Sequence, residues 1–351
     1  MNNILLTFDY ELFGSGSGDV IKHLIEPTNK ILLVLDKLKV KATFFVEQLE
    51  IDALISLKNT FPAESKEFMD AIAIEEQISL IIKKGHDIQL HLHPQWYGAD
   101  YYNGKWNLNF YWWRFSALPY TSNNGVPGKY ELIKEGKASL EKRIKPLKPD
   151  YQCHTFRAGG YNIGSEKTSV DALVDNGFKI DTSICPGYFS SSALSQYDYT
   201  AVASESDHWL SRETFLHPSF SEREVGGCIE LPLITIKSSI LEKLSFSRIY
   251  SGLRNRKYKA IKFTDERSHT KPMIESALKN TNYDVCLSSF IQVRRFNHYI
   301  KESADGNDSY VVLIGHPKDY SVFSPMPKIL RGLRKSNEFI TASDLVRGIC
   351  K

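Results

Sequence analysis

The sequence predicts an α/β fold with a largely parallel sheet or barrel, because short apolar runs alternate with helical patterns along the chain. Several of these runs end in an acid, a histidine or an arginine, as in folds whose chemistry gathers at the carboxyl ends of parallel strands. The chain has 351 residues, of which 42% are apolar, so it can bury a large core. No linker divides it, and we expect residues 1–351 to form a single domain.

In the amino-terminal half, three apolar runs alternate with two helical patterns. Pro27 fits the first turn of a helix that reaches about Lys39. Residues 65–84 repeat apolar side chains at three-to-four spacing, and Gly85 ends the amphipathic helix that this spacing predicts. The apolar runs predict strands over 2–9, 41–47 and 86–92.

The carboxyl-terminal half continues this alternation with longer interruptions. Helices are predicted over 129–145 and over 345–349, and Val170, Leu173 and Val174 mark a further helix that ends at Gly177. Further strands are predicted over 153–157, 178–184, 228–234, 284–290 and 310–316. We expect two insertions, an aromatic one at about 97–128 and a long one at about 187–308.

Composition excludes several classes of protein. The net charge of +3 is too small to predict a nucleic-acid partner. No run of 18 apolar residues predicts a transmembrane helix, and the first residues do not resemble a signal peptide. The cysteines are widely spaced, which favours reduced thiols and a cytoplasmic location. They are Cys153, Cys185, Cys228, Cys286 and Cys350.

Two acids end the first predicted strand. Asp9 and Glu11 are two residues apart, so on a strand both carboxylates lie on one face. Because like charges repel at that distance, a bound cation would stabilise the pair. One carboxylate would then be a metal ligand and the other a general base. The alternative is two solvated acids after an edge strand.

The segment HLHPQW ends another predicted strand. His91 and His93 share a face if the strand continues to Pro94, whereas one helical turn would bring Gln95 beside His91. Two imidazoles with a carboxylate and an open position are typical of zinc and related divalent metals. The alternative is a pair of structural histidines.

Three more polar residues end predicted strands. Arg157 precedes two glycines and can hold a carboxylate ionised. Asp181 could orient a histidine, pair with Arg157 or cap a turn. His316 ends a buried strand, where it can donate a proton or stabilise an oxyanion.

Two further segments indicate surface functions. The stretch 243–262 is basic with interleaved apolar residues, which predicts either a peripheral contact with anionic lipid or a solvated helix face. Aromatic faces stack on sugars, so the tryptophans of the first insertion are candidates for a glycan surface or for the core. They are Trp96, Trp106, Trp112 and Trp113.

Seven segments in order resemble the polysaccharide deacetylase (NodB-homology) superfamily, which includes carbohydrate esterase family four. They are TFDYE, ATFFVE, GHDIQLHLHPQW, FRAGGY, GFKIDTSI, ELP and LIGHP. The matching segments span residues 7–317, apart from the stretches 187–227 and 235–308. The resemblance implies an irregular TIM-like (β/α) barrel with inserted loops and a divalent metal cofactor, often zinc.

The resemblance implies roles for the residues at matching positions. Asp9 matches the general base that takes a proton from the attacking water, and Arg157 matches the arginine that steadies this base. Glu11 and His91 match metal ligands. The family has its second metal histidine four residues after the first, where this chain has Gln95, so we assign the second imidazole to His93.

The remaining implied roles concern the leaving group and the oxyanion. His316 matches the histidine that protonates the leaving amine, and Asp181 matches the acid that tunes this histidine. A backbone N–H after Gly187 or Tyr188 matches the group that holds the oxyanion.

The implied activity is that of a metal-dependent hydrolase of a non-peptide C–N bond. It would remove an N-acyl group, expected to be acetyl, from a sugar or glycan during surface-polysaccharide or lipopolysaccharide biosynthesis. The alternative is a non-catalytic, glycan-binding member of the same fold, which the replacement at Gln95 suggests.

Overall fold

The centre of the computed structural model is one nine-stranded sheet. The structure describes residues 2–202, 208–218, 226–259, 279–302 and 309–349. The strands of the sheet are β1 (Asn2–Tyr10), β2 (Thr43–Glu47), β3 (Asp87–Leu92), β6 (Thr155–Ala158), β7 (Ile180–Asp181), β10 (Trp209–Ser211), β11 (Cys228–Glu230), β14 (Tyr310–Gly315) and β15 (Asn337–Ile340). Their order is β10-β11-β7-β6-β3-β2-β1-β14, with β15 paired to β1.

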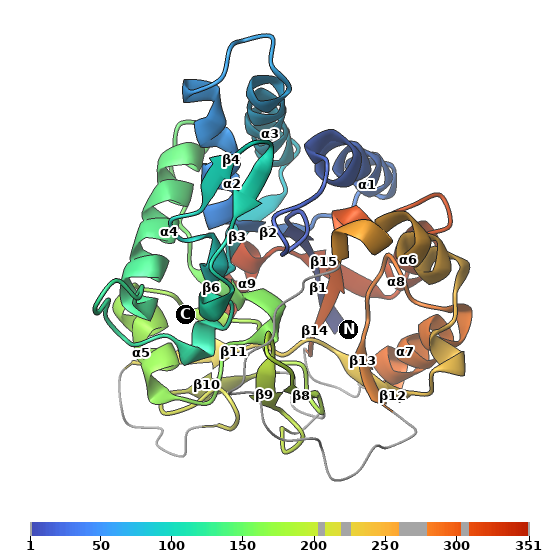
Figure 1. Ribbon diagram of the computed structural model, residues 1–351. Helices are drawn as coiled ribbons and strands as arrows, with labels where there is room; N and C mark the ends of the chain where they lie inside the picture. Colours follow the sequence, from blue (N-terminus) through green and yellow to red (C-terminus); the bar gives the residue numbers. More distant parts are fainter. Residues whose placement is uncertain (1, 203–207, 219–225, 260–278, 303–308, 350–351) are drawn as a thin grey trace.

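Strand β1 lies between three neighbours, which curls the sheet (Figure 1). Its residues 7–10 pair with β2, its residues 2–5 pair with β15, and β14 runs along its other edge. Among the described pairs of this sheet only that of β10 with β11 is antiparallel. The predicted α/β fold, an irregular (β/α) barrel, is confirmed.

Helices surround the sheet (Figure 1). They are α1 (Glu26–Leu38), α2 (Gln48–Ser56), α3 (Lys66–Lys83), α4 (Lys129–Ile144), α5 (Lys167–Asp175), α6 (Phe246–Lys259), α7 (Phe290–Glu302), α8 (Met326–Leu333) and α9 (Ala342–Ile349). Helix α3 begins after Ser65, whose hydroxyl accepts a hydrogen bond from the Phe68 N–H, and it ends before Gly85, whose φ is 75°. These are the limits that the spacing and the glycine predict.

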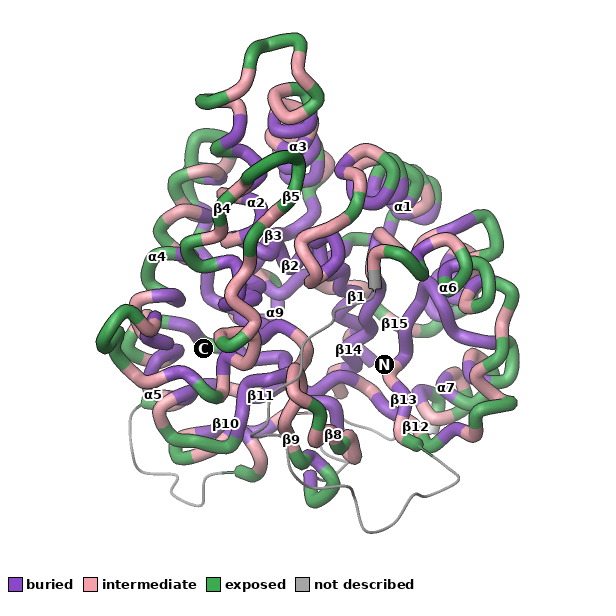
Figure 2. The backbone as a smooth tube through the Cα atoms, in the orientation of Figure 1, coloured by how far each residue is buried: buried purple, intermediate pink, exposed green. Residues whose placement is uncertain are grey.

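Strands β1, β2 and β3 are buried on both faces, as Figure 2 shows for the middle of the molecule. In β1 the side chains of Ile4, Leu6 and Phe8 belong to the larger apolar cluster, while Leu5 belongs to a second, smaller one. A parallel sheet covered on both faces requires such continuous apolar runs. The polar residues that follow these runs therefore emerge at one edge of the sheet.

The strand predicted over 284–290 is wrong. Only Asp284 makes a bridge, to Ile314 of β14, and the chain then turns into α7. The Asp284 carboxylate accepts hydrogen bonds from the N–H groups of Cys286 (2.8 Å) and Leu287 (3.1 Å), which closes the turn instead of extending a strand. The strand predicted over 178–184 is reduced to β7.

The two insertions differ in character. The first contains the antiparallel pair β4 (Asp100–Tyr102) and β5 (Lys105–Asn107). The second contains β8 (Phe189–Ser191) paired with β9 (Gln196–Asp198), and β12 (Thr235–Ser238) paired with β13 (Lys279–Asn282). It also supplies β10 and β11 to the main sheet, so part of it completes the core.

The described residues bear on the predicted absence of a transmembrane helix and on the predicted reduced cysteines. No described helix is long and apolar enough to cross a membrane. Cys153, Cys185 and Cys286 are free and buried, Cys228 is buried, and Cys350 lies outside the described residues.

Candidate metal centre and acid–base site

The carboxyl ends of neighbouring strands bring six of the seven candidate residues together. Asp9 belongs to β1, and Glu11 directly follows it. His91 belongs to β3, where it pairs in register with Arg157 of β6, while His93 and His316 directly follow β3 and β14. Short 3-10 turns begin at Pro94 and Pro317, which end these two strands behind the histidines.

Glu11, His91 and His93 form a buried group whose ligand atoms all lie within 4.8 Å of one another. Glu11 Oε2 is 3.4 Å from His91 Nε2 and 3.0 Å from His93 Nε2. These distances bring three electron-pair donors to one point.

The tautomer of His91 tests whether the group fits a metal. His91 Nδ1 is 2.8 Å from the backbone carbonyl oxygen of Arg157, which can only accept a hydrogen bond, so Nδ1 carries the proton. In the neutral ring, Nε2 then directs its lone pair at Glu11 Oε2, another lone-pair atom. Two such atoms repel each other unless a proton or a metal ion lies between them, and the open lone pairs suit a metal ion. A metal-binding histidine typically holds its second nitrogen in this way, so the residues fit a divalent ion.

Gln95 lies behind His93 instead of completing the ligand group. Its amide nitrogen is 3.3 Å from His93 Nδ1, the ring nitrogen that faces away from Glu11. Its Oε1 is buried and has no hydrogen-bond partner among the described residues. Turning the amide over gives Oε1 a partner in a protonated Nδ1 and leaves Nε2 of His93 as the ligand atom. The turned amide gives up the long contact of its nitrogen with the Gly14 carbonyl oxygen, at 3.4 Å. Gln95 therefore supports the His93 ring.

Gly159 gives the His93 ring its space. A Cβ atom at this position would lie 2.5 Å from His93 Nδ1. The FRAGGY segment therefore permits a close approach of backbone and imidazole, as its glycines predict.

Replacing Gly159 by alanine is expected to weaken divalent metal binding by about 10- to 100-fold, because the added methyl group displaces His93. The measurement is titration of the metal-free protein with zinc. Gly332→Ala is the matched control, since a Cβ there meets nothing within 4 Å. Equal affinities in the two variants would contradict the assignment of His93 as a ligand.

Lys318 is a site residue that the sequence analysis missed. Its Nζ donates to Glu11 Oε1 at 2.6 Å and to the Leu12 carbonyl oxygen at 2.5 Å. Burial alone raises the pKa of Glu11, but Lys318 and both imidazoles outweigh burial and hold this pKa well below its usual range. Lys318 thus occupies one carboxylate oxygen and leaves Oε2 to the histidines. The signal was its place two residues after His316 at the same strand end.

Two buried glutamates fix the backbone on either side of the ligand group. Glu47, at the end of β2, accepts the His93 N–H through Oε1 at 2.7 Å, and Glu50 accepts the Leu12 N–H at 3.0 Å. Burial raises the pKa of Glu47 well above its usual value and that of Glu50 to about 8. Burial therefore favours the neutral form of both acids next to the ionised Glu11.

Asp9 is held by the buried Arg157 guanidinium. Arg157 Nη1 donates to Asp9 Oδ1 at 2.5 Å, and its Nε donates to the Thr182 carbonyl oxygen at 3.0 Å. The guanidinium also lies 4.2 Å from the centre of the Phe45 ring. Burial raises the pKa of Asp9, but the charges of Arg157, His91 and His316 together outweigh burial, so the net pKa lies below the usual value. Asp9 is therefore a fixed carboxylate next to the ligand group.

His316 bridges Asp9 and a second acid that the sequence analysis did not assign. Its Nε2 is 3.6 Å from Asp9 Oδ2, and its Nδ1 is 3.3 Å from Asp284 Oδ2. Burial lowers the pKa of His316, but the hydrogen bond to Asp284 and the charge of Asp9 outweigh it and raise this pKa above its usual value. The geometry therefore favours an imidazolium that can donate a proton from Nε2.

The structure does not bring Asp181 to His316, so the expected partner of this histidine is corrected to Asp284. The Asp181 carboxylate accepts from Ser183, from the hydroxyl at 2.8 Å and from the N–H at 3.0 Å. Side chains alternate along an extended chain, so Thr182 faces Arg157 and Asp181 faces the other way. Burial raises the pKa of Asp181 to about 6 and that of Glu230 beside it well above its usual value.

Asp181 and Glu230 predict a pH dependence of stability. The folded pair keeps a proton that the unfolded acids release above about pH 4, so the free energy of unfolding falls as pH rises from about 4 through the raised values. Glu230→Gln is expected to make this fall clearly shallower, because one of the two carboxyl groups with a raised pKa is removed. The measurement is urea unfolding at pH 5 and pH 8, with the exposed acid Glu135→Gln as control. Parallel pH profiles in wild type and Glu230→Gln would refute it.

One of the two expected oxyanion donors is engaged elsewhere. The Tyr188 N–H, which follows Gly187, donates to the Cys185 carbonyl oxygen at 3.0 Å, so it does not hold an oxyanion in this structure.

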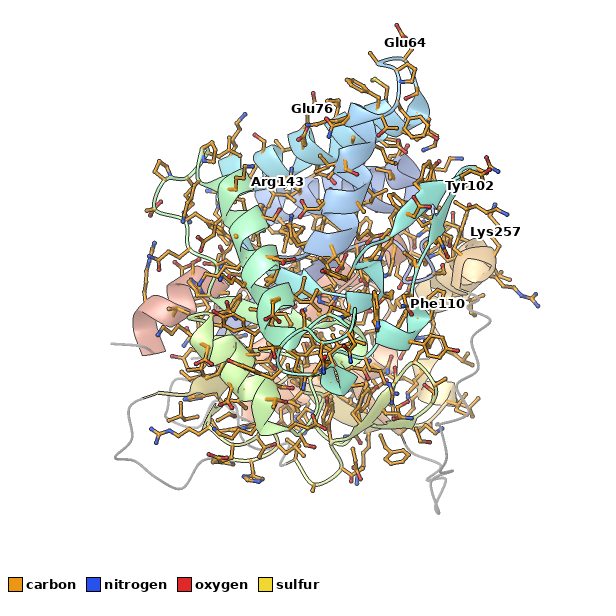
Figure 3. The ribbon with its side chains drawn as sticks, turned by 60° about the vertical axis from the view of Figure 1, so that its left-hand side comes forward. Glu64, Glu76, Tyr102, Phe110, Arg143 and Lys257 are labelled. Carbon is orange, nitrogen blue, oxygen red and sulfur yellow. The ribbon has the colours of Figure 1, made fainter. Side chains whose placement is uncertain are left out.

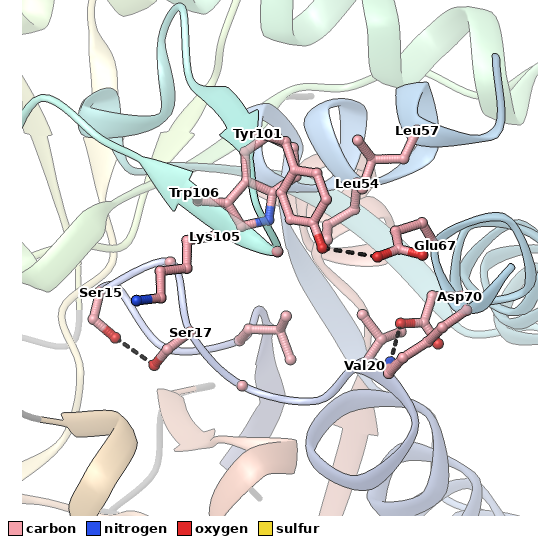
Figure 4. Close-up of a pocket in the computed structure, with 15 residues that line it drawn as sticks. Ser15, Ser17, Val20, Leu54, Leu57, Glu67, Asp70, Tyr101, Lys105 and Trp106 are labelled. Atoms are coloured by element: carbon pink, nitrogen blue, oxygen red, sulfur yellow. Dashed lines mark hydrogen bonds and ion pairs between the residues drawn. The ribbon is translucent and has the colours of Figure 1, made fainter. Parts of the chain in front are cut away.

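A pocket of about 580 Å³ follows the chain beyond Glu11 (Figure 4). Its walls include the loop residues Ser15 and Ser17 and the aromatic side chains of Tyr101 and Trp106. Tyr101 donates to Glu67 at 3.0 Å, which fixes its ring. The pocket therefore combines aromatic faces with polar groups, a lining that suits a sugar.

The tryptophans of the first insertion divide between core and site. Trp96 is buried, Trp106 lines the pocket, and Trp112 lines a second hollow farther along the insertion. The Trp113 ring stands edge-on to His93, with 5.4 Å between centroids, and its indole N–H is buried with no partner among the described residues. Trp113 therefore presents an unused donor beside the ligand group.

No family model and no curated protein matches the chain. Several solved structures resemble the chain at low sequence identity. A 4-alpha-glucanotransferase from Thermococcus litoralis is 9% identical, with a TM-score of 0.51 over 99% of this chain and 40% of that chain. A putative polysaccharide deacetylase from Mycobacterium smegmatis is 13% identical, with a TM-score of 0.48 over 99% and 90% of the two chains. A probable polysaccharide deacetylase from Pseudomonas aeruginosa PAO1 is 9% identical, with a TM-score of 0.45 over 99% and 89%.

Proposed function

We propose that this protein is a metal-dependent hydrolase that removes an N-acyl group, acetyl in the simplest case, from a sugar. The observation that carries the proposal is that three kinds of group meet at the carboxyl ends of neighbouring strands. A ligand group of Glu11, His91 and His93 lies beside an ionised Asp9 and a histidine, His316, poised to donate a proton. Amide hydrolysis needs all three: activation of water, a base and an acid.

The chain's own residues supply the proton transfers. Asp9, kept ionised by Arg157, takes a proton from the water whose oxygen attacks the carbonyl carbon. His316 gives the proton on Nε2 to the amide nitrogen as the C–N bond breaks, so the products are a carboxylic acid and an amine. Asp284 holds the other ring nitrogen and stabilises the imidazolium.

Glu11, His91 and His93 would hold the divalent ion, with zinc our first choice because of its preference for imidazole and carboxylate ligands. When bound, such an ion lowers the pKa of water and polarises a carbonyl group. Lys318, Gln95 and Gly159 orient the ligands by holding Glu11 Oε1, His93 Nδ1 and the His93 ring plane.

The proposed substrate is an acylated sugar of surface-polysaccharide or lipopolysaccharide biosynthesis in the cytoplasm. Tyr101 and Trp106 offer faces for a sugar ring, and Trp113 offers an N–H next to the ligands. The buried free thiols suit a reducing compartment. The alternative of a non-catalytic glycan binder rested on Gln95, whose contact with His93 Nδ1 gives it a supporting role in a metal site.

Metal removal tests the proposal. Wild-type protein stripped with a chelator is expected to lose at least 100-fold in the rate of acetate release from N-acetylated nucleotide sugars, and to regain it with zinc, cobalt or manganese. The assay follows free acetate together with the new primary amine, so that hydrolysis of an ester is distinguished from that of an amide. Equal rates with and without chelator would refute a metal-dependent mechanism.

A further inference from the structure

One surface of the molecule exposes many large apolar side chains. They come from residues 240–253, from the start of α7 and from the loop before α8, and we call this set the α6 surface. Its members are Ile240, Leu241, Leu244, Phe246, Ile249, Tyr250, Leu253, Phe290, Ile291, Val322 and Phe323. Phe246 is 81% exposed and Val322 is 88% exposed. Contiguous exposure of this kind marks an interaction site.

Contacts join the three segments of the α6 surface. The Tyr250 and Phe323 rings meet edge to face, with 5.4 Å between centroids. Glu242 and Arg295 form an ion pair at 2.9 Å, which ties the chain before α6 to α7. Figure 1 shows α6, α7 and α8 on one side of the molecule. The apolar side chains therefore belong to one surface.

Helix α6 buries its polar face and exposes its apolar face. Its buried positions are Ser247, Ser251 and Asn255, which recur every four residues. Ser251 donates to the Asp319 carboxylate, and Asn255 Nδ2 donates to the Lys318 carbonyl oxygen at 3.0 Å. Surface helices normally bury their apolar stripe. Here polar contacts hold the helix to the fold, and the apolar stripe faces outward.

The charge on α6 indicates what the apolar stripe meets. Its sequence FSRIYSGLRNRKYK contains five arginines and lysines and no acid. Arg256 and Lys257 are exposed, and the Lys257 Nζ lies 4.7 Å from the centre of the Tyr258 ring (Figure 3 labels Lys257 on this helix). Long cationic side chains flanking an apolar stripe are typical of helices that lie in the interface of an anionic bilayer.

We propose that the α6 surface docks the protein on an anionic lipid bilayer. The apolar side chains enter the headgroup region, and the exposed cations Arg256 and Lys257 pair with lipid phosphates, whereas Arg254 donates to the carbonyl oxygens of Lys318 and Tyr320. Helix α6 also contacts the chain next to the ligand group. Its Asn255 donates to the Lys318 carbonyl oxygen, and the Lys318 Nζ donates to Glu11, so two hydrogen bonds connect α6 to the ligand group. Docking itself does not depend on the proposed function. The sequence segment 243–262 continues past the described residues, which end at 259 in this region.

Vesicle flotation tests the docking. The purified full-length chain is mixed with vesicles of phosphatidylcholine alone, or of phosphatidylcholine with phosphatidylglycerol. We expect at least tenfold more protein on the anionic vesicles at low salt, and progressive release as sodium chloride is added. No binding to either vesicle, or equal binding to both, would overturn the proposal.

Variants assign the binding to α6. Phe246→Ser with Leu253→Ser is expected to lower the bound fraction about tenfold or more, whereas Leu33→Ser on α1, where the side chain is 66% exposed, is the matched control. Arg256→Glu with Lys257→Glu should abolish the preference for anionic lipid, against Lys30→Glu with Lys37→Glu on α1. Circular dichroism checks the fold of each variant. A wild-type dimer that the apolar variant dissociates, without lipid binding, would instead assign the surface to a protein interface.

Discussion

Replacing Asp9 by asparagine is expected to lower kcat for N-acyl hydrolysis by about a thousandfold, the contribution of a positioned general base. Asparagine keeps the shape and can still accept the hydrogen bond from Arg157, but it cannot take a proton. Because Asp9 lies outside the ligand group, the variant should bind metal with nearly wild-type affinity. Acetate release and metal titration on the same preparation check both expectations.

Asp181→Asn is the matched control for this change. It alters a buried aspartate on another strand of the same sheet, but this carboxylate binds Ser183 and faces away from His316. We expect its kcat to stay within a few-fold of wild type. Full activity in Asp9→Asn would remove Asp9 as the base, and an equal loss in both variants would show that the effect comes from packing.

The pattern of strands and strand ends was predictable from the sequence because it is local. Apolar runs set β1, β3, β6 and β14, and the polar residues that follow them meet at one edge because the strands are parallel. That single inference places Asp9, Glu11, His91, Arg157 and His316 together. The role of Gln95 could not be predicted, because only the packed structure shows that its amide lies next to His93 Nδ1.

The missed residues depend on tertiary packing. Lys318 reaches Glu11 across 307 positions of sequence, and no local pattern encodes that contact. Asp284 was expected inside a strand, whereas its carboxylate closes a turn and thereby points Oδ2 at His316. Asp181 illustrates the sensitivity of an extended chain to register, because one residue decides which side chain faces the site. There the inward position belongs to Thr182.

Replacing His91 by alanine is expected to abolish metal binding, which wild type should show at about one divalent ion per chain. The variant removes the donor whose tautomer the Arg157 carbonyl group fixes, so at least a 100-fold loss of affinity is expected. Metal analysis of the purified proteins checks stoichiometry. The rise in melting temperature on adding zinc checks it independently, because a ligand that binds only the folded state stabilises it.

The exposed histidine variant His217→Ala is the control for His91→Ala and should keep both the ion and the rise in melting temperature. The structure also explains how wild-type protein could lack a metal ion. Lys318 already neutralises Glu11 through Oε1, so the chain could remain folded with an ammonium as the only cation at this carboxylate. If wild type takes up no zinc, cobalt or manganese, Lys318 has replaced the metal. In that case a glycan-binding role explains the aromatic pocket better than hydrolysis.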